Sequence, residues 1–366
     1  MRTVSRKIII FLLSIIIGAI VLFPGNVYAE SGSSFWIDYI DVGQGDSALI
    51  QCDGHYMLID GGPSDASSVV YTVLKNADIH NMDYMIATHP DADHIGGLSG
   101  ALNYATVGKC YSPVTSHDTK TFNNLLKYLS KQNITLTVPR AGEAFKLGSA
   151  LVQIVGPIYS SSDTNNNSIV VKITYGSKSF LFMGDAENEE ESTILYARND
   201  LTCDVLKVGH HGSSSSTSSA LLKKVNPDYA VISVGKNNSY GHPTKETLNK
   251  LTQADITIYR TDLNGDIICT SDGRNISFIT EKNVKLDDIN TSGTNPPAYS
   301  KNIANTSPVV VIPSGTTYVL NTNTRKFHYP SCSSAGDIKP SNRRDVSASR
   351  DEIMAQGYIP CKRCNP

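Results

Sequence analysis

Residues 88–97 read Thr-His-Pro-Asp-Ala-Asp-His-Ile-Gly-Gly, and this stretch decides the fold. It holds two histidines and two aspartates at adjacent or alternate positions: His89, Asp91, Asp93 and His94. It follows an apolar segment, residues 84–87, that predicts a buried strand. A loop that is pinned between a strand end and a Gly-Gly turn can hold neutral imidazoles and ionised carboxylates around a metal ion. The spacing therefore predicts a metal site.

Three more polar segments follow apolar runs further along the chain. They are Met183-Gly184-Asp185, Gly209-His210-His211-Gly212-Ser213 and Tyr240-Gly241-His242-Pro243. In open α/β sheets, binding sites form beyond the ends of the strands. We therefore expect all four segments to contribute to one shared site.

The pattern between these segments predicts an α/β domain. Residues 35–62 predict an opening β-meander, and helical spacing of apolar residues predicts helices over 67–76 and 122–131. Helices are also expected near Ala220 and Lys245. The Asn264-Gly265 pair predicts a closing hairpin between strands at 256–260 and 267–270. Further strands are expected at 152–155, 169–175, 179–183, 205–208 and 229–234.

The order of the motifs carries a resemblance to a known family. "DVGQGD", "THPDADHIGG", "FMGDAE", "LKVGHHGSSSS" and "YGHP" resemble the metallo-β-lactamase superfamily, in particular the hydrolase domain of the ComEC-type DNA-uptake proteins, over residues 35 to about 282. The resemblance implies an αββα sandwich with a two-metal site at one edge of the paired sheets. It further implies a hydrolase that acts through a metal-activated water.

Residue roles follow from the same resemblance. His89 and Asp91 would serve one metal, Asp93 and His94 the other, and Asp185 would bridge the two. The pair His210 and His211, together with His242, would complete the ligand shells. From the chemistry of a two-metal site, either Asp93 or Asp185 would hold the nucleophile, and whichever of His211 and His242 is not a ligand would stabilise charge or protonate the leaving group.

The chain also departs from the commonest pattern of that family. Asp91 stands where many members have histidine, and this oxygen-richer site leaves zinc and manganese as alternatives. His117 is the one histidine between His94 and His210, and its polar loop argues against a role as a ligand. Asn167 and Ser168 are expected to contact substrate or a metal-bound water instead.

The first 29 residues predict a signal peptide. Basic Arg2, Arg6 and Lys7 precede an apolar run over 8–23, and Val27-Tyr28-Ala29 ends it with small residues at the positions that a signal peptidase reads. An uncleaved anchor is the alternative. We expect a secreted protein that begins near Glu30, is not stably inserted in the membrane after cleavage, and is either released or associated with the cell surface.

The C-terminal region predicts a linker and a small module. Residues 283–313 are rich in Asn, Ser, Thr, Pro and Gly, as linkers are. Residues 314–366 are too few to bury a sizeable core unaided, so a metal or disulfide is expected to stabilise them. His328, Cys332, Cys361 and Cys364 predict a zinc site, with a disulfide as the alternative. The module resembles the Ada-type metal-binding domain found on secreted nucleases.

Composition and charge limit the classes of protein and the functions that this chain can have. With 40% hydrophobic and 18% charged residues, the chain is neither disordered, collagenous nor a many-span membrane protein. The C-terminal module is basic, whereas residues 30–313 are acidic. The leading hypothesis is a phosphodiesterase that cleaves extracellular DNA. One alternative is an esterase for small envelope phosphodiesters such as phosphorylcholine esters, and another is a protein that binds an envelope polymer and has lost catalysis.

Overall fold

A computed structural model describes residues 34–282 except residue 198, and residues 316–364 except 331, 349, 356 and 357. The chain divides into two compact units between residues 300 and 301, and each is described by itself. The predicted signal peptide (1–29) and linker (283–313) lie outside the described residues.

The first unit is built on two sheets. The eight-stranded sheet has the order β15-β14-β1-β2-β3-β4-β5-β6. Its outer strands β3 to β6 are parallel, whereas β1 lies antiparallel between β2 and β14. The bounds are β1 Phe35–Tyr39, β2 Ala48–Cys52, β3 His55–Ile59, β4 Asn81–Ile86, β5 Thr106–Tyr111, β6 Leu136–Thr137, β14 Ile267–Ser271 and β15 Ile276–Thr280.

The seven-stranded sheet has the order β13-β12-β11-β10-β9-β8-β7. Its strands are antiparallel from β7 to β10 and parallel from β10 to β13. The bounds are β7 Ala144–Leu147, β8 Ala150–Gly156, β9 Val170–Tyr175, β10 Lys178–Phe182, β11 Val205–Lys207, β12 Tyr229–Ile232 and β13 Thr257–Arg260.

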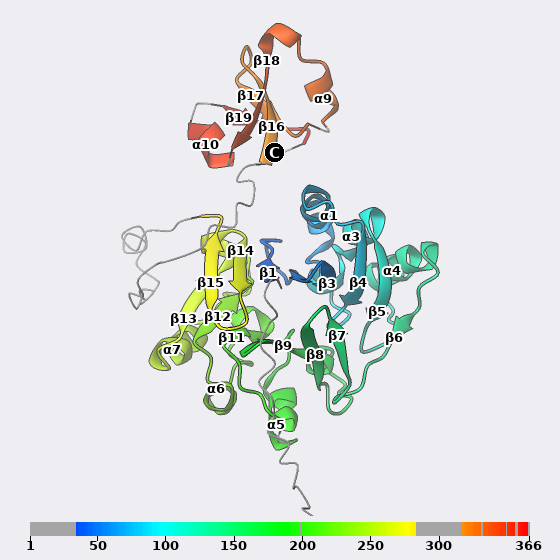
Figure 1. Cartoon of the computed structure of the whole chain (residues 1–366), viewed down its shortest axis with the longest axis vertical. Helices are drawn as coiled ribbons and strands as arrows, with labels where there is room; N and C mark the ends of the chain where they lie inside the picture. Colours follow the sequence, from blue (N-terminus) through cyan, green and yellow to red (C-terminus); the bar gives the residue numbers. More distant parts are fainter. Residues whose placement is uncertain are drawn as a thin grey trace, which may run out of the picture. The chain divides into compact units, whose positions relative to one another are not determined.

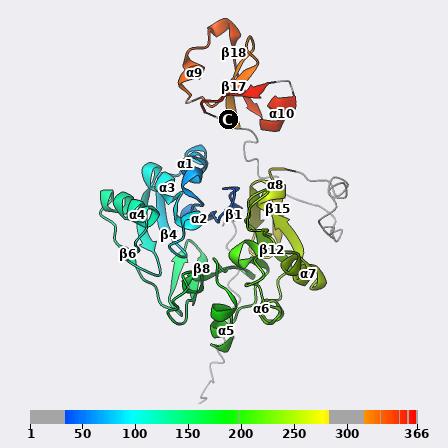
Figure 2. The same cartoon turned by 180° about the vertical axis from the view of Figure 1, so that it is seen from behind.

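Helices cover the outer face of each sheet. Figures 1 and 2 show α1, α3 and α4 on one side of the unit and α6 and α7 on the other, and α5 packs on the same core as α6 and α7. The bounds are α1 Ser67–Asn76, α2 Ala92–Ile95, α3 Leu98–Tyr104, α4 Lys120–Lys131, α5 Asn188–Tyr196, α6 Ser219–Val225, α7 Lys245–Gln253 and α8 Thr261–Asn264. Short 3₁₀ turns are η1 Ser64–Ala66, η2 Asn165–Asn167 and η3 Gly209–Gly212.

Three apolar cores separate these layers. Ile37 and Phe180 belong to the core between the two sheets, Leu74 and Phe122 to the core under the first helical layer, and Leu221 to the core under the second. Each such fully buried side chain contributes about 1.5 to 3 kcal/mol. The order helix, sheet, sheet, helix confirms the predicted αββα sandwich.

The predicted closing hairpin is wrong. β13 pairs parallel to β12 in the seven-stranded sheet, and β14 pairs with β1 in the other. Asn264 ends α8, and Gly265 follows it with φ 66°. The Asn-Gly pair therefore ends a helical turn that carries the chain between the sheets, since the burial of Ile267 and Cys269 between the sheets outweighs a local turn preference.

The second unit is a small four-stranded sheet with the order β18-β16-β17-β19. Its apolar core consists of small clusters around Phe327 and around Val319. The bounds are β16 Thr316–Asn321, β17 Lys326–His328, β18 Arg343–Ala348, β19 Ile359–Pro360, α9 Ser333–Gly336, α10 Arg350–Ala355 and the 3₁₀ turn η5 Pro340–Asn342.

In the described ranges of both units, every helix is too short or too polar to cross a membrane.

Candidate metal centre

The predicted site residues lie at strand ends of both sheets. His89 follows β4, and Asp93 and His94 lie in α2 just after it. From the other sheet, Asp185 follows β10 and His211 lies in η3 after β11. The site therefore lies across the seam between the two sheets of the sandwich.

The Asp185 carboxylate is the centre of this cluster. Its Oδ1 lies 3.2 Å from His94 Nε2, and its Oδ2 lies 3.9 Å from His89 Nε2 and 3.5 Å from His211 Nε2. His211 Nε2 is also 3.4 Å from Asp93 Oδ2. Two groups of close donor atoms result, one from His89, His94 and Asp185 and the other from Asp93, His94 and His211.

These donor atoms fit divalent metal ions. Nε2 of His89, His94 and His211 and Oδ1 of Asp185 are buried and make no hydrogen bond to any described residue. Buried polar atoms without a partner are costly, and imidazole nitrogens and carboxylate oxygens are ligands that zinc and manganese accept. Bound cations would satisfy all four atoms at once.

The carboxylates also give the site a strong preference for positive charge. Burial alone would lower the pKa of His94, but Asp185 and Asp60 hold it well above 6.5. His211 shows the same balance, with burial opposed by Asp185 and Asp46. A divalent ion would supply the charge that these two imidazoles otherwise take up as protons.

A second layer of polar groups orients His94 and His89. Asp60 Oδ2 is 2.9 Å from His94 Nδ1, which leaves Nε2 free to face the centre. The Thr88 amide and hydroxyl both donate to Asp60, at 2.8 and 2.6 Å. Ser168 Oγ accepts the Asp185 N–H at 3.0 Å and lies 3.4 Å from His89 Nδ1.

His211 is oriented by groups from both sheets. Its Nδ1 donates to the Ser233 carbonyl at 2.9 Å and lies 3.1 Å from Asp46 Oδ1, at ion-pair distance. The other oxygen of Asp46 is 2.7 Å from Lys207 Nζ. Burial raises the pKa of Asp46, but Lys207 and His211 bring it down to about 2. Asp46 is therefore a buried carboxylate that holds its charge.

The adjacent pair of histidines separates into two environments. His211 is buried, whereas the His210 side chain is 22% exposed. His210 Nδ1 lies 2.9 Å from Glu187 Oε1, which also accepts the Ser215 hydroxyl at 2.7 Å. His210 Nε2 is 3.7 Å from Asp185 Oδ2, so His210 borders the cluster while His211 lies within it.

The remaining predicted residues lie around this cluster. Asp91 Oδ2 is 4.0 Å from His89 Nε2 and its side chain is 42% exposed. The His242 ring lies 5.5 Å from that of His210, and burial, followed by the charges of His210 and His211, lowers its pKa to about 4. Asn167 instead bonds to residues 161 and 163, and His117 packs against Phe122.

Sequence reasoning missed several of the supporting residues. Asp60 and Asp46 had been given no role, although Asp46 ends the quoted "DVGQGD" motif. The signal was available in that motif and in Asp60-Gly61-Gly62 at the end of β3, because both place a carboxylate at a strand end beside the metal segment. Lys207 and Glu187 had no signal beyond their places in the quoted motifs.

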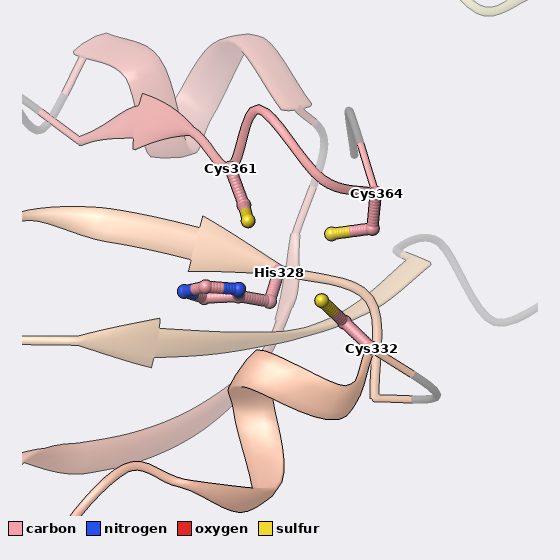
Figure 3. Close-up of side chains that lie close together, drawn as sticks. All are labelled: His328, Cys332, Cys361 and Cys364. Atoms are coloured by element: carbon pink, nitrogen blue, oxygen red, sulfur yellow. The ribbon is translucent and has the colours of Figure 1, made fainter.

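The C-terminal unit brings its four predicted ligands together. His328 ends β17, Cys332 precedes α9, and Cys361 and Cys364 follow β19, with their side chains pointing toward one another (Figure 3). The four ligand atoms all lie within 4.8 Å of one another. The three thiols are free, and His328 Nδ1 is buried without a hydrogen-bond partner in the described residues. Three thiols and an imidazole suit zinc.

The cysteines of the first unit are also unpaired. Cys52, Cys110, Cys203 and Cys269 are buried free thiols. Burial raises the pKa of Cys110 to about 12, which makes its thiolate scarce at neutral pH.

Comparison with known proteins agrees with this geometry. The sequence profile of the metallo-beta-lactamase superfamily matches residues 40–236, which carry most of the metal cluster. The chain belongs to the metallo-β-lactamase superfamily. It is 29% identical to "ComE operon protein 3" of Bacillus subtilis over 68% of this chain and 34% of that protein. It is 32% identical to "Recombination protein 2" of Haemophilus influenzae over 65% of this chain and 29% of that protein.

The chain spans about a third of the length of these relatives. Among solved structures, the metallo-β-lactamase fold protein YhfI of Bacillus subtilis aligns with a TM-score of 0.44 at 14% identity, covering 65% of this chain and 100% of that one.

The resemblance to the ComEC-type branch is confirmed by the relatives. The family membership and the metal centre make the protein a metal-dependent hydrolase.

Proposed function

We propose that this hydrolase is a secreted phosphodiesterase that cleaves DNA. The observation that carries the proposal is the cluster of buried imidazole and carboxylate atoms around Asp185 that make no hydrogen bond in the described residues, with His210 bordering it. Two similar proteins, "Competence protein ComA" of Neisseria gonorrhoeae and "Recombination protein 2" of Haemophilus influenzae, are named for processes that involve DNA, and this supports DNA as the substrate.

The residues present would hold two divalent ions. His89, His94 and Asp185 would hold one, and Asp93 and His211 would hold the other, with Asp91 as a further ligand of the first. Bound ions of this kind activate a water for attack and neutralise charge on phosphoryl oxygens.

The chain's own residues would then orient the substrate. Asp93 is 33% exposed at its side chain, so it can accept a hydrogen bond from the attacking water. Glu187 accepts the Nδ1–H of His210 and fixes the ring with Nε2 toward the cluster, where the imidazolium form can donate to a phosphoryl or leaving-group oxygen. His242 takes a neutral form beside it, and its imidazole can accept or donate a single proton.

The acidic charge of residues 30–313 bears on how DNA would be held. Broad electrostatic capture of DNA requires many Lys and Arg contacts to phosphates. We infer that the basic C-terminal module, with one zinc at His328, Cys332, Cys361 and Cys364, anchors the enzyme to DNA or another anionic polymer of the envelope.

The same acidic charge favours a second candidate, the hydrolysis of small phosphodiesters of the cell envelope. A substrate with one phosphate needs only the metal centre and no basic surface. The two candidates share the chemistry and differ in the substrate.

The test uses purified protein that is stripped of metal and reloaded separately with zinc and with manganese. End-labelled single-stranded and duplex DNA are assayed beside a chromogenic phosphodiester, with Asp93→Ala as the control. Metal-dependent cleavage of DNA that the control lacks is the expected result. Turnover of the small ester alone would replace the nuclease with the envelope phosphodiesterase, and full activity of the control would refute the site assignment.

A further inference from the structure

A row of aromatic rings leads from the metal centre to the surface. The His210 ring borders the cluster, with Nε2 3.7 Å from Asp185 Oδ2. The His242 ring lies 5.5 Å from it at an angle of 76°, and the Tyr240 ring stacks on His242 at 5.8 Å and 24°. The row therefore ends on Tyr240, which is 67% exposed.

The position of Tyr240 is set by its loop and not by packing in a core. The Asn238 side chain accepts the backbone N–H groups of Tyr240 and His242, at 3.1 Å each, and donates to the His242 carbonyl at 2.6 Å. This brace fixes residues 238–242 independently of the tyrosine ring. A large aromatic ring held so exposed, next to a catalytic centre, offers a flat face to a ligand.

We propose that Tyr240 is the stacking platform for a nucleobase of single-stranded DNA, next to the phosphate that is hydrolysed. This inference rests on the proposed function and names the form of DNA that the site accepts. Base stacking on an aromatic side chain is tolerant of sequence, because every base has a π-face. In duplex DNA those faces are covered by neighbouring bases, so the platform selects single strands.

Charge supports a base over a second phosphate as the occupant. The unit is acidic overall, and Lys236 is exposed on the same loop as Tyr240. One lysine cannot neutralise a run of phosphates, whereas one stacked base contributes affinity without any positive charge. Stacking thus explains how an acidic hydrolase could hold a polyanion beside its metal ions.

The experiment compares two oligonucleotides of equal length and charge. One is a single-stranded oligothymidylate, and the other carries abasic sugars at its central positions. Each is assayed with metal-loaded wild-type protein, Tyr240→Ala and Tyr240→Phe, by cleavage and by fluorescence anisotropy. Tyr196→Ala is the matched control, since Tyr196 is 83% exposed at the end of α5 and has no part in the aromatic row.

We expect Tyr240→Ala to lower kcat/KM and affinity for the base-bearing oligonucleotide about 5- to 100-fold, and to cause no further loss on the abasic one. Tyr240→Phe keeps the ring and should stay within about twofold of wild type. If Tyr240→Ala lowers kcat/KM and affinity equally for both oligonucleotides, the inference is overturned and the effect is assigned to His242. Unchanged kcat/KM and affinity for the base-bearing oligonucleotide would also overturn it.

The proposed function fails separately from this inference. Suppose that neither wild type nor any variant cleaves either oligonucleotide, that wild type binds the base-bearing one more tightly, and that Tyr240→Ala loses this preference. The stacking role of Tyr240 is then supported and the nuclease activity is refuted. If the wild-type protein binds both oligonucleotides alike, the platform is refuted whatever the cleavage result.

Discussion

Replacing Lys207 by methionine would remove the nearer of the two cationic groups beside the buried Asp46 carboxylate and leave it with His211 alone. Lys207 and Asp46 are 3% and 5% exposed, and their charged atoms are 2.7 Å apart. Removing one partner of a buried ion pair costs about 3 to 5 kcal/mol. Lys207 Nζ also donates to the Val208 carbonyl at 2.9 Å, a hydrogen bond whose loss adds about 1 kcal/mol. We expect metal-free Lys207→Met to lose about 4 to 6 kcal/mol of unfolding free energy at pH 7.

The pH dependence of this loss has a definite sign. Burial raises the pKa of Asp46, and Lys207, ahead of His211 and His94, brings it down to about 2, so the loss of Lys207 moves that pKa back up toward the ordinary value near 3.8. The stability that wild type draws from the lowered pKa is present above about pH 3.8 and is lost as pH falls toward 2. The deficit of the variant relative to wild type should therefore be smaller near pH 2.5 than at pH 7.

Urea denaturation followed by tryptophan fluorescence measures this loss. Trp36 is the single tryptophan of the chain and lies in β1, so its emission reports on the sandwich unit. Lys282→Met is the matched control, because Lys282 is 43% exposed and pairs with Asp41 at 3.4 Å, where a loss below about 1 kcal/mol is expected. Adding Asp46→Asn to Lys207→Met removes the stranded charge and should recover part of the stability. A Lys207→Met loss no greater than that of the control would refute the reasoning.

Three further predictions concern other parts of the chain. Asp60→Asn should weaken metal binding about 10- to 100-fold, because it releases the ring of His94, and competition with a chromogenic chelator measures this; an unchanged affinity would contradict the orienting role. Cys361→Ser should abolish zinc binding by the C-terminal module and expose that unit, but not the sandwich, to limited proteolysis, whereas an equally resistant module would show that it folds without metal. Burial raises the pKa of Glu190 to about 7, so between about pH 4.5 and pH 7 the folded protein keeps a proton that the unfolded chain loses, and stability falls as pH rises through that range. Glu190→Gln should therefore gain about 1 to 2 kcal/mol of unfolding free energy at pH 8 and little at pH 4. An equal gain at both pH values would exclude this cause.

Much of the sandwich could be predicted from local pattern. The helical spacing of apolar residues placed α1 at Ser67–Asn76, and apolar runs placed β9 and β11 within a residue or two. The closing hairpin could not be placed, because strand pairing depends on which sheet has a free edge. Ile267 pairs with Tyr39, and nothing near residue 267 in the sequence encodes that partner.

The metal segment was predictable because its ligands are neighbours in the sequence. Asp60 and Asp46 were not, since each gains its role from a residue that is distant in the chain, His94 for one and Lys207 for the other. The assignment of His210 and His211 also needed the fold. Both have positive φ values, 48° and 52°, and only the backbone direction of η3 decides that His211 turns inward.

The pairing of β1 with β14 has a consequence for biosynthesis. Phe35 emerges from the ribosome long before Ser271, the last residue of β14, beside which it lies in the folded sheet. Until then one edge of β1 presents unpaired backbone groups, which are prone to intermolecular association. The nascent domain cannot close before nearly all of it has been synthesised, so a chain that stalls or is cut short before residue 267 would be left with an adhesive edge, and a translocating or holding factor that keeps it extended would protect it.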